Sequence, residues 1–212
     1  VEIDVPLHGL MYCRDGTFSY FIKRFDRIGP HGKVAIEDFA QLAGLTRDSK
    51  YDFSMEKLLK IVDEYCTFPM LEKIKLFKRT VFNFIVGNED MHVKNFSVIR
   101  TDGKVCLSPA YDYLNTTSPF RLLGKSAAEI EEIALPLRGK KKNLTRNLLI
   151  DYFGKERAGL NRETIEGILE DFRQAVSKWK KLLRASFLSS EMKELYGELI
   201  EDRLSLLGLL KT

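Results

Sequence analysis

The residues GNEDMHVKNFS, numbered 87–97, stand between two segments of opposite character. The segment before them, residues 70–86, carries apolar side chains on too wide a face for a surface helix, which predicts a buried central helix. Gly87 and Asn88 are typical of a helix carboxyl end. The polar side chains that follow therefore belong to a connection at the end of a core helix, and they do not fill a core.

The segment after this connection is predicted to be a β-hairpin. Residues 95–100 and 104–107 are rich in β-branched and apolar side chains, and they flank the dipeptide Asp102-Gly103. An Asp-Gly pair between two such runs is typical of a tight hairpin turn. A hairpin here would hold the residues before and after it in fixed relative positions.

Three oxygen-bearing side chains around this hairpin have the spacing of a phosphoryl-transfer site. Four residues separate Asp90 from Asn95, as in the protein kinase catalytic loop, where Asp accepts the substrate hydroxyl proton and Asn ligates magnesium. Asp112 follows the second hairpin strand, where a kinase keeps its second metal aspartate. Because Mg²⁺ prefers oxygen ligands, Asn95 and Asp112 are candidate metal ligands and Asp90 is the candidate base.

Each candidate also has a plainer interpretation. Asp90 could cap a helix end, and Asp112 could be an ordinary turn residue after Pro109. His92 is more typical of a structural hydrogen-bond donor, holding the backbone of Asp90 or Asp112, than of a base. Lys94 could approach the γ-phosphate or face water. The functional hypothesis rests on the three residues occurring together.

The amino-terminal part predicts another hairpin and a hinge. Residues 10–25 place aromatic and β-branched runs on both sides of Asp15-Gly16, which indicates a β-hairpin. Gly-Pro-His-Gly at 29–32 then interrupts the pattern and marks a hinge within residues 26–33.

The rest of the chain is predicted to be mostly helical, with residues 108–126 as an ordered loop. The 3.6-residue periodicity of apolar side chains predicts helices at 37–45, 54–65, 127–133, 145–153, 161–186 and 190–210. Ser54 is the candidate amino-terminal cap of the helix at 54–65. The fold class is therefore α+β: short β-hairpins beside a predominantly α-helical lobe. We expect two parts, a β-hairpin and hinge at 1–28 and a helical lobe at 29–212.

Composition excludes several classes of protein. The 212 residues are 44% hydrophobic and 30% charged, with a formal net charge of +4 and no apolar run long enough to span a membrane. Cys13, Cys66 and Cys106 are odd in number and lack C-x-x-C spacing, so neither a disulfide framework nor a zinc site is indicated. A reducing cytoplasm is the simplest interpretation. The start, VEIDVP, resembles neither a signal peptide nor an initiator segment, which suggests a fragment.

The motifs together resemble a known family. NEDMHVKNFS at 88–97 looks like the signature of HipA-like serine/threonine protein kinases, and LSPAYD at 107–112 resembles the metal-binding segment of that family. Further similarities, which extend the resemblance to about residue 155, are KRFDR at 23–27, EDFAQ at 37–41, Lys50-Tyr51 and LPLRGK at 135–140.

The resemblance implies a protein-kinase-like fold that uses ATP and Mg²⁺ to phosphorylate serine or threonine in proteins, including aminoacyl-tRNA synthetases. It implies the toxin component of a toxin-antitoxin system, paired with a helix-turn-helix antitoxin. It also implies that Ile22, Lys23, Arg24 and Phe25 bracket adenine at the lobe junction, although Phe25 could equally be a core aromatic. The family's glycine-rich loop and ATP-anchoring lysine have no match here, so the N-lobe is expected to be largely missing.

Three other functions stay open from the sequence. The chain could be an incomplete kinase-like lobe that works as a protein-binding module or as one half of a split kinase. It could be a nucleic-acid adaptor through the basic run RGKKK at 138–142, but that run has no aromatic residues and is typical of a solvated loop. A phosphoinositide kinase shares the Asp-x-His-x-x-Asn loop, but no basic amphipathic helix is present to bring it to a membrane. We therefore expect neither direct nucleic-acid contact nor membrane contact.

Overall fold

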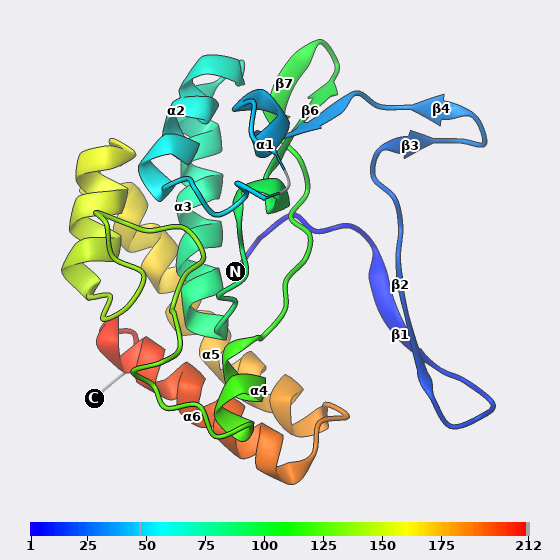
Figure 1. The fold of residues 1–212 in the computed structure, drawn as a ribbon, viewed down its shortest axis with the longest axis vertical. Helices are drawn as coiled ribbons and strands as arrows, with labels where there is room; N and C mark the ends of the chain where they lie inside the picture. The colour runs from blue at the N-terminus through cyan, green and yellow to red at the C-terminus, as the bar shows by residue number, and fades with distance from the viewer. Residues whose placement is uncertain (47, 211–212) are drawn as a thin grey trace.

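The computed structural model describes residues 1–46 and 48–210 and has the predicted α+β class, mostly helical with short antiparallel sheets (Figure 1). The strands are β1 (His8–Tyr12), β2 (Phe18–Ile22), β3 (Arg27–Ile28), β4 (Gly32–Lys33), β5 (Ile36–Asp38), β6 (Ser97–Thr101) and β7 (Lys104–Leu107). The helices are α1 (Phe39–Leu42), α2 (Met55–Tyr65), α3 (Pro69–Val86), the 3-10 turn η1 (Val93–Asn95), α4 (Thr117–Leu122), the π-helix η2 (Asn147–Arg157), α5 (Arg162–Ala185) and α6 (Ser190–Leu206).

Both predicted hairpins are confirmed. Strands β1 and β2 pair antiparallel with Leu10 opposite Tyr20, and β6 pairs with β7 with Val98 opposite Leu107. The structure adds β5, which pairs with β6 and completes a three-stranded sheet. It also adds the small β3–β4 hairpin at the predicted hinge. Figure 1 shows β1–β2 and β3–β4 extending from one side of the helical body.

The predicted buried central helix is α3. It begins with Pro69, a residue well suited to the first helical position because its missing N–H has no intrahelical partner there. Its side chains Leu76, Phe77 and Phe84 are fully buried. Helix α2 packs beside it and starts at the predicted cap, Ser54, whose hydroxyl accepts the N–H of Lys57.

The carboxyl half departs from the prediction in two places. The helix expected at 127–133 is wrong, because those residues form turns whose backbone groups pair with the basic run instead. The N–H of Glu132 donates to the carbonyl of Lys141 (2.7 Å), and Lys142 Nζ donates to the carbonyl of Ala128 (2.8 Å). The predicted loop 108–126 contains the short helix α4, which Asn115 initiates by accepting the N–H of Ser118 (2.8 Å). The other carboxyl-terminal helices are present as η2, α5 and α6.

The predicted division at residue 28 falls between β3 and β4, so it lies inside the small hairpin and not in an extended linker. Whether it separates two domains stays a prediction. Among the residues that the structure describes, no helix has both the length and the apolar character needed to cross a membrane.

Candidate active site

Gly87 turns the chain out of α3 and into the candidate site. Its φ of 70° is left-handed, and a Cβ built there would lie 2.5 Å from Leu199 Cδ2, so both conformation and space require glycine. Its carbonyl accepts the backbone N–H groups of Thr116 (3.0 Å) and Thr117 (3.1 Å). The end of the central helix is thus joined to the segment that follows Asp112.

Asp90 and Asn95 lie on one tight turn. The N–H of His92 donates to the carbonyl of Asp90 (2.8 Å), and the N–H of Asn95 donates to the carbonyl of His92 (2.9 Å). The turn η1 then delivers Asn95 to the start of β6, where only 8% of its surface is exposed. The four-residue spacing noted in the sequence therefore corresponds to a closed, hydrogen-bonded loop.

Asp112 meets Asn95 across this loop. The Asn95 Nδ2 group donates to Asp112 Oδ2 at 2.7 Å, and Asn88 Nδ2 donates to the backbone carbonyl of Asp112 at 3.1 Å. Asp112 has a φ of 61°, a left-handed conformation in which Asp and Asn are enriched among residues other than glycine. The two candidate metal ligands are adjacent although they lie 17 positions apart in the sequence.

The two candidate ligands suit magnesium better than a metal ion whose ligands all come from protein side chains. The described residues contain no group of three or more His, Cys, Asp or Glu side chains able to hold a metal ion. Mg²⁺ commonly takes one or two protein carboxylates and fills its octahedron with water and phosphate oxygens. Asp112 and the amide oxygen of Asn95 fit that requirement.

Asp90 is held by a residue far away in the sequence. Tyr51, in the loop before α2, donates its hydroxyl to Asp90 Oδ1 at 2.5 Å. Asp90 also takes part through its backbone, since its carbonyl lies 3.4 Å from Asn95 Nδ2. Its side chain is thus linked to Tyr51 and its backbone to Asn95, one of the two candidate metal ligands.

The structure assigns different surroundings to His92 and Lys94. The His92 ring is buried against Tyr51, and its Nδ1 atom has no hydrogen-bond partner among the described residues. Only its backbone holds Asp90, so the predicted side-chain contact to the Asp90 or Asp112 backbone is wrong. Burial lowers the pKa of His92, and nearby Lys50 adds to this. Lys94 is half-buried, and its carbonyl accepts the hydroxyl of Tyr111 at 3.0 Å.

The four predicted adenine-binding residues line one groove together with Asp112. This groove has a volume of about 970 Å³ and runs between the β2–β3 connection and the segment 110–114. Its lining includes Ile22, Lys23, Arg24 and Phe25. The half-buried Phe25 ring stacks on Tyr111 with centroids 5.8 Å apart, which leaves both interpretations of Phe25 in place.

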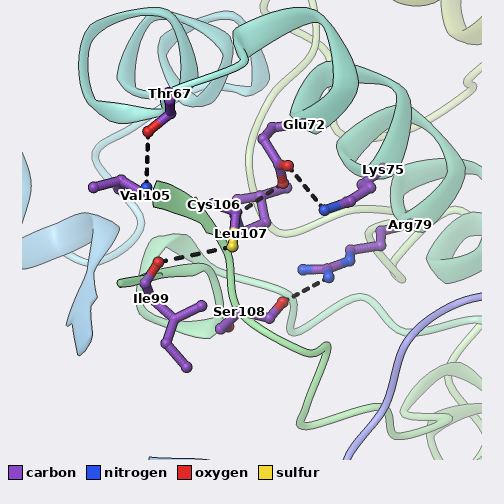
Figure 2. Close-up of polar contacts among 9 residues, drawn as sticks. All are labelled: Thr67, Glu72, Lys75, Arg79, Ile99, Val105, Cys106, Leu107 and Ser108. Atoms are coloured by element: carbon purple, nitrogen blue, oxygen red, sulfur yellow. Dashed lines mark hydrogen bonds and ion pairs between the residues drawn. The ribbon is translucent and has the colours of Figure 1, made fainter. Parts of the chain in front are cut away.

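A buried polar network fixes the segment that leads to Asp112 (Figure 2). Glu72 and Arg79, both on α3 and about 5% exposed, reach across to the end of β7. Glu72 Oε2 accepts the N–H of Leu107 at 2.9 Å, and Arg79 Nη2 donates to the carbonyl of Ser108 at 2.6 Å. Burial lowers the pKa of Arg79. The central helix therefore anchors both ends of the site, through Gly87 and through these two side chains.

Sequence reasoning missed several residues that build this site. Tyr51 was noted only as a point of family resemblance, and Asn88 only as a helix-end residue and as part of the family signature. Glu72 and Arg79 carried one available signal, since charged side chains at buried positions of a core helix call for polar partners. Nothing in the sequence indicated which backbone groups these partners would be.

Comparisons with known proteins identify the family of this chain. The model of the HipA-like C-terminal domain family matches residues 1–179. A Sinorhizobium fredii protein named "Putative kinase Y4dM" is 47% identical over 98 residues, which is 45% of this chain and 23% of that protein. A Haemophilus influenzae protein named "Putative kinase" is 25% identical over 235 residues, covering 98% of this chain and 66% of that protein.

Solved structures show the same fold. The Shewanella oneidensis HipA structure, a toxin-antitoxin complex with HipB and operator DNA, aligns with a TM-score of 0.72 at 18% identity over 97% of this chain and 52% of that chain. The Helicobacter pylori proinflammatory kinase CtkA aligns with a TM-score of 0.65 at 17% identity, over 97% of this chain and 74% of that chain. This chain thus spans about half of the HipA chain. With its family model matched over residues 1–179, the chain belongs to the HipA-like C-terminal domain family of kinase-named proteins.

Proposed function

We propose that this chain carries the catalytic lobe of an ATP-dependent protein serine/threonine kinase, which transfers the γ-phosphate of ATP to a protein hydroxyl. The observation that carries the proposal is the 2.7 Å contact between Asn95 and Asp112, of which Asp112 lines the same groove as residues 22–25. Membership of a family whose matched relatives are named as kinases supports it.

The chain's own residues take distinct roles in this proposal. Asp90 receives the proton of the acceptor hydroxyl as the phosphoryl group is transferred. Asn95 and Asp112 hold Mg²⁺, which when bound neutralises charge on the phosphate oxygens. Lys94 faces the phosphates and His92 supports the loop. Because phosphoryl transfer depends mostly on alignment and charge stabilisation, a rigid loop is the main contribution of the protein.

The groove is the proposed nucleotide site. Its lining includes Ile22, Lys23, Arg24 and Phe25 as well as Asp112. A nucleotide with its base at the β2–β3 connection would therefore have a proposed metal ligand, Asp112, within the same groove. Residues 1–28 would then represent the N-lobe side of the site and residues 29–212 the C-lobe side.

The proposed partners are proteins. We propose a protein substrate, with aminoacyl-tRNA synthetases as the class implied by family resemblance, and a helix-turn-helix antitoxin that pairs with this chain as a toxin. The structural neighbour from Shewanella oneidensis is described in complex with HipB and operator DNA, and this supports the antitoxin proposal. No direct contact between this chain and nucleic acid is proposed.

A second candidate function is a protein-binding module or one half of a split kinase. The observation that favours it is the exposure of large apolar side chains on both strands of the β1–β2 hairpin, including Leu10 (58%), Tyr12 (71%) and Tyr20 (61%). Such a surface is typical of one that packs against another polypeptide.

The test is a phosphoryl-transfer assay with magnesium-ATP and dephosphorylated casein, on the wild-type chain and on Asp90→Asn and Asp112→Asn. We expect each substitution to reduce transfer by about 100-fold or more. Asp63→Asn is the matched control, because the exposed Asp63 carboxylate on α2 forms an ion pair with Lys73 on α3 (2.7 Å) and lies outside the proposed site. Transfer that survives Asp90→Asn would refute the assignment of the base, and an inactive chain that binds a partner protein would favour the second candidate.

A further inference from the structure

The contact between Tyr51 and Asp90 is not explained by any role assigned so far. The Tyr51 hydroxyl donates to Asp90 Oδ1 at 2.5 Å across 39 residues of sequence. Among the described residues, Asp90 Oδ2 accepts no hydrogen bond. A carboxylate can accept on both oxygens, so Tyr51 occupies one of them and leaves the other available.

Tyr51, which is 40% exposed, makes ring contacts with three neighbouring side chains. The edge of its ring packs against the buried His92 ring, with centroids 5.4 Å apart and planes at 79°. Lys50 Nζ lies 4.8 Å and Lys141 Nζ 5.8 Å from the ring centroid, within the range of cation–π attraction. These contacts use the ring and leave the hydroxyl for Asp90. The ring therefore has contacts that do not depend on its hydrogen bond.

The hydroxyl is a permanent donor at neutral pH. Burial, together with the hydrogen bond to Asp90, raises the pKa of Tyr51 to about 12. Since the phenol keeps its proton, the direction of the hydrogen bond is fixed from Tyr51 to Asp90. The Asp90 backbone is fixed as well, because its carbonyl accepts the N–H of His92 at 2.8 Å.

We propose that Tyr51 is a positioning residue for phosphoryl transfer: its hydroxyl holds Oδ1 of Asp90 so that Oδ2 remains free for the acceptor hydroxyl. The inference rests on the proposed function, in which Asp90 is the base. Tyr51 acts through Asp90 and does not line the nucleotide groove. Its loss should therefore slow transfer to the acceptor without weakening nucleotide binding.

The test compares Tyr51→Phe with the wild-type chain. Phenylalanine keeps the ring contacts to His92 and the two lysines and removes only the hydroxyl. With magnesium-ATP and dephosphorylated casein, we expect kcat to fall by about 10- to 100-fold, as for a misplaced catalytic group. By calorimetry, the Kd for a nonhydrolysable magnesium–ATP analogue should change by less than about twofold, because Tyr51 makes no groove contact.

Tyr152→Phe is the matched control. The Tyr152 hydroxyl donates to Glu56 Oε1 at 3.1 Å, and Arg138 lies over its ring at 5.2 Å, so the same atom is removed from a similar tyrosine–carboxylate pair. Neither Tyr152 nor Glu56 belongs to the proposed site. We expect kcat of this variant to stay within about twofold of wild type, since no positioned catalytic group is disturbed.

A double-mutant cycle separates positioning from a general structural role. If Tyr51 acts through Asp90, Tyr51→Phe should cost nothing further in the Asp90→Asn background. An additive loss, or a weakened Kd for the nucleotide analogue, would overturn the inference in favour of a structural role. A rise in kcat on Tyr51→Phe would also overturn it and show that the hydroxyl obstructs the acceptor.

The two proposals fail in different ways. Transfer that is sensitive to Asp90→Asn but unchanged by Tyr51→Phe would overturn only the positioning role. Transfer that is absent in the wild-type chain, or insensitive to Asp90→Asn, would overturn the proposed function and this inference with it.

Discussion

The β1–β2 hairpin and the loop 87–97 both border the candidate site, yet they are built in opposite ways. Every residue of β2 is exposed, and the hairpin is stabilised mainly by pairing between its own neighbouring strands. The loop buries polar groups, with Asn88 1% and Asn95 8% exposed, and its hydrogen bonds reach Tyr51, Asp112 and Thr116. The proposed metal and base side of the site is therefore tied to the rest of the fold by long-range hydrogen bonds, whereas the proposed nucleotide-base side depends on local strand pairing.

The largest expected effect is on the proposed metal and base side, at Arg79. Arg79→Ala removes the donor to the Ser108 carbonyl and leaves a cavity in the core, so we expect the free energy of unfolding to fall by about 2–4 kcal/mol. Urea denaturation measures this. Arg100→Ala, at an exposed position on β6, should change it by less than about 0.5 kcal/mol. Equal effects would show that the buried network does not anchor the site.

A substitution at Gly87 tests whether the carboxyl end of α3 requires glycine. Gly87→Ala should lower the free energy of unfolding by about 2–3 kcal/mol, because it combines left-handed strain with a clash against Leu199. Gly44 has a similar φ of +64° but open space around it, so Gly44→Ala should cost only about 1 kcal/mol. Thermal or urea unfolding compares the two variants. Equal costs would mean that the clash relaxes freely.

Asn88 links the end of α3 to the segment that carries Asp112. Asn88→Ala removes the contacts to Asn83 Oδ1 (3.2 Å) and to the Asp112 carbonyl (3.1 Å), and should cost about 1–2 kcal/mol of stability. Asn147→Ala, an exposed control, should cost less than about 0.5 kcal/mol. If the link matters for function, phosphoryl transfer by the folded Asn88 variant should also decrease.

The buried His92 ring makes the proposed metal and base side sensitive to acid. Because burial lowers the pKa of His92, the unfolded chain binds a proton below about pH 6.5 while the folded chain resists it. Stability attributable to His92 is therefore unchanged above that pH and is lost as the pH falls below it. Urea midpoints at pH 7.5 and 5.5 should differ more for wild type than for His92→Gln. The exposed His31→Gln should behave like wild type.

The smallest effect is expected on the hairpin. Leu10→Thr removes an exposed apolar side chain opposite Tyr20 and should change the free energy of unfolding by no more than about 0.5 kcal/mol. The buried Leu58→Thr on α2 is the contrasting variant and should cost several times more. A large loss at Leu10 would show that the hairpin supports the helical body and would break the comparison.

The sequence predicted this fold where the signals were local. The Asp-Gly turns, the Ser54 cap and the wide apolar face of α3 were each sufficient to place an element. The helix expected at 127–133 failed because its apolar positions, such as Ile130 and Ile133, are buried while the backbone pairs with the chain at 141–142. The periodicity of apolar residues indicates which side chains are buried, and at 127–133 those side chains are buried without a helix.

The candidate site was predictable only in part for the same reason. Spacing and family resemblance singled out Asp90, Asn95 and Asp112, and made the last two candidate ligands of a metal ion. The Tyr51 contact joins residues 39 positions apart, and the Arg79 contact ends on a backbone carbonyl. Neither contact can be predicted from the neighbouring sequence, because the packed fold determines which distant residues meet.

The left-handed backbone at Asp112 limits which acid can occupy that position. Aspartate tolerates this conformation because its short side chain can hydrogen-bond locally, whereas glutamate would pay about 1–2 kcal/mol for the same φ. Two side chains of equal charge and similar affinity for divalent ions are therefore unequal here. The backbone conformation at Asp112 therefore favours aspartate over glutamate at this candidate metal ligand, whether or not an ion is bound.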